Sequence, residues 1–138
     1  MSNIHIFAEK LRSLGLRPTQ QRIIIYSLLF DRKDTFHFTI DDLKNILKNT
    51  SIKKISLATI YNTIHSLKDK GYLKEISINS EKTYFDTNIS KHHHFFDENK
   101  RELIDLDDKD VGKIKIKKAV PGKKITSIEV LVKIANNN

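Results

Sequence analysis

The clearest structural signal in the chain is Ser56-Leu57-Ala58-Thr59-Ile60-Tyr61-Asn62-Thr63-Ile64-His65-Ser66-Leu67-Lys68-Asp69-Lys70-Gly71-Tyr72-Leu73. Its apolar residues recur three and four apart, the period of one helix face: Leu57, Ile60, Ile64 and Leu67. The Ser56 hydroxyl can accept a bond from a free backbone N–H of the first turn, and Gly71 can end the helix in a left-handed conformation. The opposite face is small and polar, with no carboxylate before Asp69. Such a face is typical of a helix that enters the major groove of DNA.

Three helices are predicted before this one, at residues 3–14, 20–30 and 40–48. Asn3 and Thr19 are the expected N-caps of the first two, and Gly15 is the expected end of the first. Thr39 and Asp42 have the spacing of a capping box at the start of the third. Residues 31–38 are predicted to be a loop.

Two short strands follow the last helix, at residues 72–78 and 82–86, and residues 79–81 form the turn between them. Helices followed by a two-stranded hairpin indicate a winged helix. Beyond residue 91 a run of histidines and aromatic residues at 92–96 is followed by strand patterns at 102–106 and 128–134, and lysine alternates with Ile114 and Ile116 over residues 113–118. These last 50 or so residues hold too little apolar material for a core of their own. Their sheet must therefore be buried on the first domain or on a second copy of the chain, and we favour self-association.

Composition limits the classes of function. The chain has 25 basic and 17 acidic residues, a net charge of +8 and a pI near 9.6, which favours a polyanionic partner. It has no cysteine, which excludes disulfides, thiolate zinc sites and cysteine nucleophiles. No apolar run is long enough to cross a bilayer and no export signal is present at the N-terminus, so we expect a cytoplasmic protein without membrane contact.

The chain resembles the ferric uptake regulator (Fur) superfamily in four motifs. They are Leu16-Arg17-Pro18-Thr19-Gln20-Gln21-Arg22, Ser56-Leu57-Ala58-Thr59-Ile60-Tyr61-Asn62-Thr63-Ile64, Tyr84-Phe85-Asp86 and His92-His93-His94. Within the superfamily it is most similar to the iron response regulator (Irr) branch. That similarity rests on residues 82–88, on the two aromatic residues and Glu98-Asn99 after the histidines, and on the lack of cysteine.

The resemblance implies an α+β fold: a winged-helix DNA-binding domain at residues 1–88 and a small α/β dimerisation and ligand-sensing domain at residues 89–138. It also implies a homodimeric transcription regulator of iron and haem homeostasis. Such a regulator binds an inverted-repeat operator in double-stranded DNA and releases it when haem binds. Some Irr proteins carry an N-terminal Cys-Pro haem motif, which this cysteine-free sequence lacks. Haem sensing here would therefore depend on the histidine cluster.

The resemblance assigns Tyr61 and Asn62 to the major groove and Arg17 to the minor groove. Asparagine pairs bidentately with adenine, and an A/T-rich minor groove attracts arginine. Phosphate contacts are expected from Ser56 and Thr59, together with Lys53 and Lys54. The structural alternative is that Tyr61 is a packing residue and the lysines form a solvated rim.

The histidine run is the second candidate site. In an extended segment His92 and His94 face one side and His93 the other, so the run can supply two sites. Neutral imidazole suits haem iron and Fe, Mn or Zn ions. The resemblance implies a regulatory site at positions matching His37, Asp86 and His94, in which Phe96 replaces a family histidine. It implies a second site at the position matching His93, where Phe95 replaces an acid.

Three alternatives to the haem-responsive regulator remain. One is a metal-activated repressor of the same superfamily, which responds to Fe, Mn or Zn. Another is a metal-dependent hydrolase, which needs a general base and a substrate cleft that no motif here indicates. The third is a scaffold that only dimerises. For the histidines themselves, the structural alternative is that they cap strands or bond to the backbone, with His37 an ordinary loop histidine.

Overall fold

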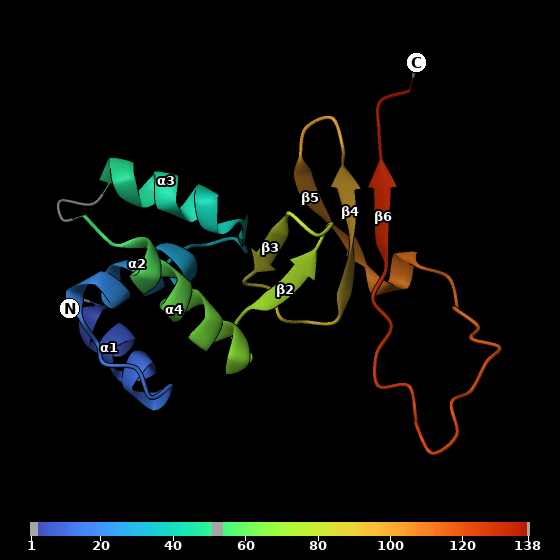
Figure 1. Cartoon of the computed structure of the whole chain (residues 1–138), viewed down its shortest axis with the longest axis horizontal. Helices are drawn as coiled ribbons and strands as arrows, with labels where there is room; N and C mark the ends of the chain where they lie inside the picture. The colour runs from blue at the N-terminus through green and yellow to red at the C-terminus, as the bar shows by residue number, and fades with distance from the viewer. Residues whose placement is uncertain (1–2, 51–53, 138) are drawn as a thin grey trace. The chain divides into compact units, whose positions relative to one another are not determined.

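The computed structural model describes residues 3–50 and 54–137 (Figure 1). Its internal contacts divide the chain into two units, Met1–Ile89 and Ser90–Asn138. The division falls one residue beyond the boundary predicted from sequence. Each unit has its own sheet, and the two are described separately below.

The first unit is a winged helix. Its helices are α1 (Ile4–Ser13), α2 (Gln20–Phe30), α3 (Ile40–Thr50) and α4 (Leu57–Asp69). Its strands are β1 (His37–Phe38), β2 (Lys74–Ser77) and β3 (Thr83–Asp86), and β2 and β3 form the antiparallel wing. The predicted order of helices and hairpin is confirmed, and the chain has the α+β fold expected from its sequence.

Side-chain caps fix where three of the helices begin. The Thr19 hydroxyl accepts the Arg22 N–H at 3.3 Å, and the Ser56 hydroxyl accepts the Thr59 N–H at 3.2 Å. Thr39 and Asp42 bond each other's backbone N–H at 2.9 and 3.0 Å, the predicted capping box. The predicted cap at Asn3 is wrong: this residue has helical dihedrals and its side chain makes no cap bond.

The core of the first unit joins all four helices to the wing. Its most deeply buried members are Leu11, Ile25, Leu29, Phe38, Leu43, Ile60, Ile64, Leu67 and Phe85. The sequence pattern predicts Leu57 on the inward face of α4, but this side chain is 45 % exposed. It is the first residue of the helix, and the buried stripe of α4 begins one turn later at Ile60.

Residues 31–38 are not wholly a loop, because His37 and Phe38 form β1. This two-residue strand pairs antiparallel with β3, which gives the sheet order β1-β3-β2. The pairing places His37 opposite Asp86. Two residues carry too short an alternation to be recognised as a strand from sequence.

The second unit is a three-stranded sheet in the order β5-β4-β6. Strand β4 (His92–Asp97) runs antiparallel to β5 (Glu102–Asp107) and parallel to β6 (Leu131–Ile134). The strand predicted at 128–134 is shorter in the structure, and the helical part of the unit is the 3-10 helix η1 (Asp108–Asp110). A long loop joins η1 to β6 (Figure 1). Among the described residues, no helix has the length and apolar character that crossing a membrane requires.

Candidate functional site

The outer face of α4 presents the side chains assigned to the major groove. Tyr61 is 44 % exposed and Asn62 is also exposed, whereas Ile60 and Ile64 of the same helix are buried. The Ser56 hydroxyl lies 2.9 Å from the Thr59 hydroxyl in addition to its cap bond. The polar N-terminal half of α4 is therefore ordered by its own cap and lies in solvent.

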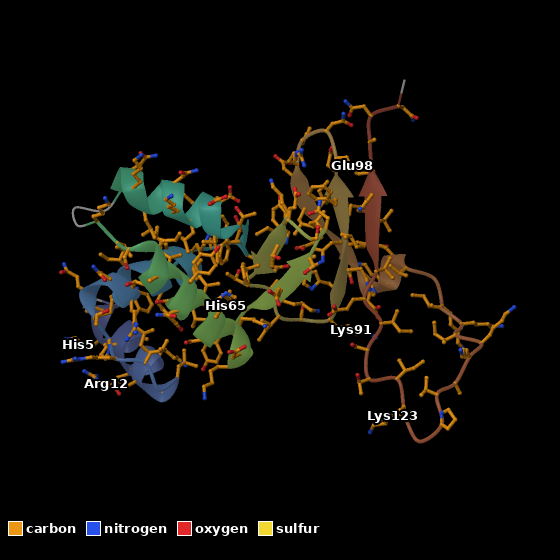
Figure 2. The ribbon with its side chains drawn as sticks, viewed as in Figure 1. His5, Arg12, His65, Lys91, Glu98 and Lys123 are labelled. Carbon is orange, nitrogen blue, oxygen red and sulfur yellow. The ribbon has the colours of Figure 1, made fainter. Side chains whose placement is uncertain are left out.

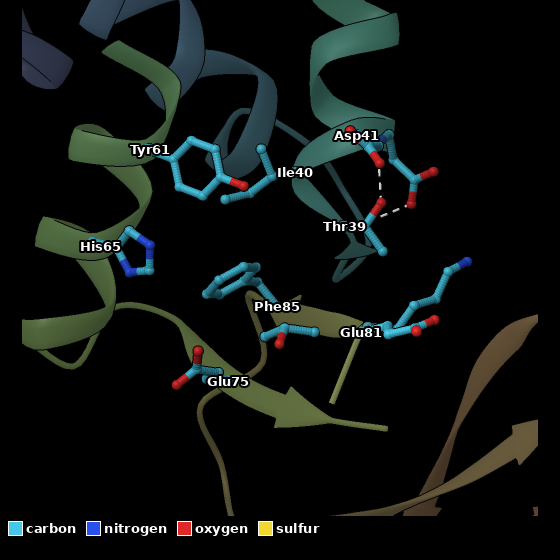
Figure 3. Close-up of a pocket in the computed structure, with 11 residues that line it drawn as sticks. Thr39, Ile40, Asp41, Tyr61, His65, Glu75, Glu81 and Phe85 are labelled. Atoms are coloured by element: carbon cyan, nitrogen blue, oxygen red, sulfur yellow. Dashed lines mark hydrogen bonds between the residues drawn. The ribbon is translucent and has the colours of Figure 1, made fainter. Parts of the chain in front are cut away.

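Aromatic stacking orients Tyr61. Its ring stacks on His65, one turn along α4, with ring centroids 5.8 Å apart and planes 16° apart. The His65 ring in turn meets the edge of the buried Phe85 ring at 6.2 Å. These three rings line one side of a cavity of about 330 Å³ between α4, the start of α3 and the wing (Figure 3). Tyr61 is thus supported from the core, although it is largely exposed.

Arg17 lies on the link between α1 and α2, and its side chain is exposed. Its carbonyl oxygen accepts two bonds, from the Thr19 N–H at 2.8 Å and from Arg22 Nη1 at 3.0 Å. Arg22 Nε is buried and has no hydrogen-bond partner among the described residues. Of the two lysines assigned to phosphates, Lys54 is exposed and Lys53 lies outside the described residues.

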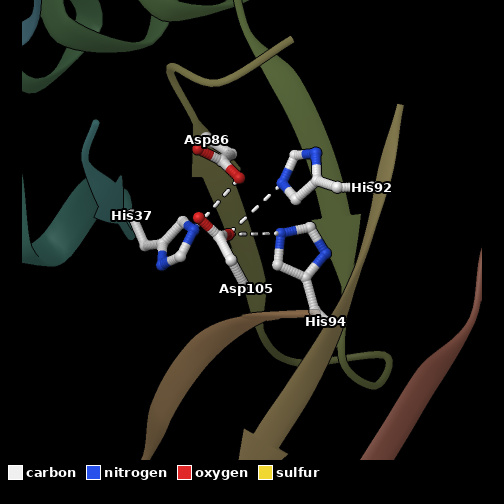
Figure 4. Close-up of side chains that lie close together, drawn as sticks. All are labelled: His37, Asp86, His92, His94 and Asp105. Carbon is white, nitrogen blue, oxygen red and sulfur yellow. Dashed lines mark hydrogen bonds and ion pairs between the residues drawn. The ribbon is translucent and has the colours of Figure 1, made fainter. Parts of the chain in front are cut away.

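In the first unit, His37 and Asp86 form a pair of potential ligands. His37 Nε2 lies 3.0 Å from Asp86 Oδ2 (Figure 4). Asp86 Oδ1 accepts the Asn88 N–H at 2.8 Å. The Asp86 side chain is fully buried. A buried carboxylate is costly unless a cation or hydrogen bonds stabilise it, and here an imidazole and a backbone N–H do so. The wing thus ends in a stabilised anionic oxygen beside an imidazole.

In the second unit, His92 and His94 project from the same side of β4 toward Asp105 of β5. Their Nε2 atoms lie 3.3 and 3.5 Å from Asp105 Oδ1, and their ring centroids are 4.4 Å apart (Figure 4). Each of the three residues offers one ligand atom, and these atoms lie within 4.8 Å of one another. Both imidazoles are buried, which limits competition from water.

The orientation of His92 follows from a bond to the backbone. Its Nδ1 lies 2.7 Å from the Ser90 carbonyl oxygen, which can only accept, so Nδ1 carries the proton. The other ring nitrogen, Nε2, is therefore the one that faces Asp105. A carbonyl that fixes the tautomer of a histidine in this way is characteristic of metal ligands in proteins.

His93 faces the other side of β4, as the alternation of an extended strand requires. Its Nδ1 accepts the Val130 N–H at 2.9 Å, so the proton of the neutral ring is on Nε2, which donates to Asp108 Oδ1 at 2.8 Å. Both ring nitrogens are thus engaged with protein groups. His93 thus ties β4 to η1 and to the residue before β6.

Sequence reasoning missed Asp105. Strand β4 and strand β5 are joined by residues 98–101, and this short connection places His94 directly opposite Asp105. The residues of both segments can be read from the sequence, but predicting that Asp105 lies beside His94 requires the register in which β4 and β5 pair. Phe96, which stands in place of a family histidine, is 3 % exposed and is one of the buried hydrophobic residues.

Comparison with known proteins identifies the family. The sequence profile of the Ferric uptake regulator family matches residues 13–133, so the chain belongs to this family. The peroxide-responsive repressor PerR of Staphylococcus aureus strain Mu50 is 33 % identical over 96 residues. That alignment covers 70 % of this chain and 63 % of the relative, so less than two thirds of the relative's length is matched.

Solved structures share the fold. The ferric uptake regulator of Pseudomonas aeruginosa with manganese superposes with a TM-score of 0.67 at 16 % identity, covering 96 % of this chain and 99 % of that one. The peroxide stress regulator of Campylobacter jejuni superposes with a TM-score of 0.59 at 21 % identity, covering 100 % of this chain and 98 % of that one. At these identities the likeness concerns the fold alone.

Proposed function

We propose that the chain is a metal-responsive transcriptional regulator that binds an inverted-repeat operator as a homodimer in the cytoplasm. The observation that carries the proposal is the convergence of two buried imidazoles and a carboxylate, His92, His94 and Asp105, in a family of regulators. A winged helix with an exposed polar face on α4 supplies the DNA-reading part.

DNA recognition is assigned to the exposed face of α4 and to the link before α2. Tyr61 and Asn62 read base edges in the major groove, and Arg17 enters the minor groove. The hydroxyls of Ser56 and Thr59 contact phosphates and set the register. Tyr61→Ala should weaken operator binding while the dimer remains intact. Tyr61→Phe keeps the ring and removes the hydroxyl, so it shows which of the two contributes to binding. Unchanged affinity in Tyr61→Ala would remove this residue from the interface.

Two groups of donors are proposed as metal ligands: His37 and Asp86 in the first unit, and His92, His94 and Asp105 in the second. Imidazole and carboxylate ligands suit Fe(II), Mn(II) or Zn(II).

Metal stoichiometry separates one shared ion from two independent sites. Manganese binding to the purified protein is measured by titration calorimetry for the wild type, His37→Ala and His94→Ala. A shared ion predicts one binding event per chain, weakened by either substitution. If His37→Ala keeps a binding event that His94→Ala loses, and His94→Ala keeps one that His37→Ala loses, the two sites are independent. That result excludes a shared ion.

The effector is a separate part of the proposal. Haem, as in the Irr branch, is the second candidate, because the paired imidazoles of His92 and His94 are also ligands for haem iron. The staphylococcal relative is named as a peroxide-responsive repressor, which adds peroxide as a third candidate effector. An electrophoretic shift assay with operator DNA distinguishes these effectors. Divalent metal that strengthens binding supports the metal-activated regulator, whereas metal-free binding that haem abolishes supports the Irr-type regulator.

A further inference from the structure

Charge is segregated along the second unit. Residues 97–110 contain seven acids against three basic residues, Lys100, Arg101 and Lys109. The loop that follows contains six lysines between residues 113 and 124 and no acid from residue 111 to residue 128. We call residues 113–124 the lysine loop. An ordinary protein surface intersperses charges of both signs, so this separation calls for a partner that supplies the missing anions.

The lysine loop lies in solvent. All twelve of its residues are exposed, including Ile116 at 53 % and Val120 at 60 %. Figure 1 shows the loop leaving the sheet between η1 and β6, and Figure 2 shows the Lys123 side chain on its outer part. Within the part of the chain that the structure describes, no ion pair involves these lysines.

The backbone of the lysine loop makes little contact with the rest of the described chain through hydrogen bonds. Among the described residues, its one hydrogen bond is a turn in which the Lys123 N–H donates to the Val120 carbonyl at 3.0 Å. Over residues 113–118 lysine recurs at every second position, at Lys113, Lys115 and Lys117, and Lys118 follows. Like charges this close together along the chain repel one another. A polyanion of regular charge spacing relieves that repulsion and releases its own condensed counterions.

We propose that the lysine loop is a second DNA-contacting element, which binds phosphates of the duplex without reading its sequence. This inference rests on the proposed function, that the chain binds duplex DNA through α4. The role of the loop is to add affinity that is equal for all sequences, while the residues of α4 discriminate between them.

The test is the salt dependence of DNA binding by the full chain. Removing one lysine–phosphate interaction should reduce the log–log salt slope by about 0.9. Four lysines of the loop are changed together to glutamine: Lys113, Lys115, Lys117 and Lys118. If all four bind phosphates, raising salt from 50 to 200 mM should weaken the wild type about 100-fold more than the variant. The reduction should be the same on operator and random duplexes.

A matched control removes the same charge from other exposed sites: Lys33, Lys100, Lys109 and Lys133 to glutamine. The control should keep most of the wild-type slope, and both variants should keep the wild-type circular dichroism and sedimentation coefficient. Equal slopes for the two variants overturn the inference while the proposed function stands. Dissociation of the dimer in the loop variant alone would make the loop an interface between copies and also overturn it. If the wild type binds no duplex, both proposals fail.

Discussion

The side chains of His93 and Asp108 tie the middle of the second unit's sheet to the turn that follows β5. The Nε2 of the histidine lies 2.8 Å from an oxygen of the carboxylate, and Val130 N–H occupies the other ring nitrogen. The histidine run is therefore divided between the two sides of the strand. His92 and His94 face Asp105, and His93 bonds Asp108 and Val130.

The same contact predicts a pH dependence of stability. The hydrogen bond from His93 is the largest cause that lowers the pKa of Asp108, and nearby Lys91 adds to it. The pKa of Asp108 is lower in the folded protein than in the unfolded chain. At pH values between the folded pKa and the ordinary Asp pKa of about 3.9, the unfolded chain therefore binds more protons. The stabilisation is therefore present above that ordinary value and is lost as the pH falls through the folded one.

Urea unfolding of the wild type and Asp108→Asn at a series of pH values from 6 down to about 2.5 tests this dependence. The free energy of unfolding should fall less steeply with acid in the variant. Asp110→Asn, which removes the same charge from the same short helix, should follow the wild type. Parallel curves for all three proteins would show that the His93 bond does not contribute.

Asp105→Asn tests the residue that sequence reasoning missed. Removing its charge takes away one charged ligand, and we expect a loss of roughly 10–100-fold in affinity for Mn(II). Glu102→Gln, on the same strand, is the control and should leave the affinity unchanged. Affinity measured by calorimetry that is the same in both variants would exclude Asp105 from the metal centre.

Arg22→Lys tests how the Arg17 link is held. The guanidinium of Arg22 bonds the Arg17 carbonyl from five residues along the chain, and a lysine ammonium does not reproduce its planar donors. We expect weaker operator binding by the variant with metal affinity unchanged. Arg17→Ala should lower affinity further, and in its background Arg22→Lys should have little additional effect. Independent, additive losses would mean that Arg22 does not act through Arg17.

Ser56→Ala tests the N-terminal cap of α4, the helix proposed to read the operator. The Ser56 hydroxyl accepts the Thr59 N–H, and loss of such a cap typically costs about 1 kcal/mol. Thermal unfolding of the variant should show that loss, and Ser56→Asp should retain most of the stability because a carboxylate also caps. Equal stability of Ser56→Ala and the wild type would show that the cap bond is not formed in solution.

Local signals in the sequence were enough for most of the winged helix. Thr19, Ser56 and the Thr39–Asp42 pair each bond within one helical turn, so they can be recognised without knowledge of the fold. Gly71 has a positive φ of 83° at the end of α4, the left-handed conformation expected there. The prediction that Leu57 is buried was wrong because periodicity identifies the apolar face of a helix but not how far along that face the core extends.

Predicting the candidate metal centre requires knowing which strands pair, and that information is not local in the sequence. His37 acquires a partner through a two-residue strand, and Asp105 lies opposite His94 only through the register of β4 and β5. Alternation correctly separated His93 from its neighbours, because the side-chain period of a strand is set by the backbone alone. The extended pattern of Lys113–Lys118 did not form a strand, since among the described residues no neighbouring strand pairs with it.

The central claim is that a metal at the histidine and aspartate donors controls operator binding. Its most direct test is the dissociation constant for operator DNA, measured by fluorescence anisotropy with and without saturating Mn(II), for the wild type and His94→Ala. Metal should tighten binding by the wild type by about 5–150-fold, the usual range of coupling between two sites, and should leave the variant unchanged. A dissociation constant for the wild type that is the same with and without Mn(II) would contradict the claim.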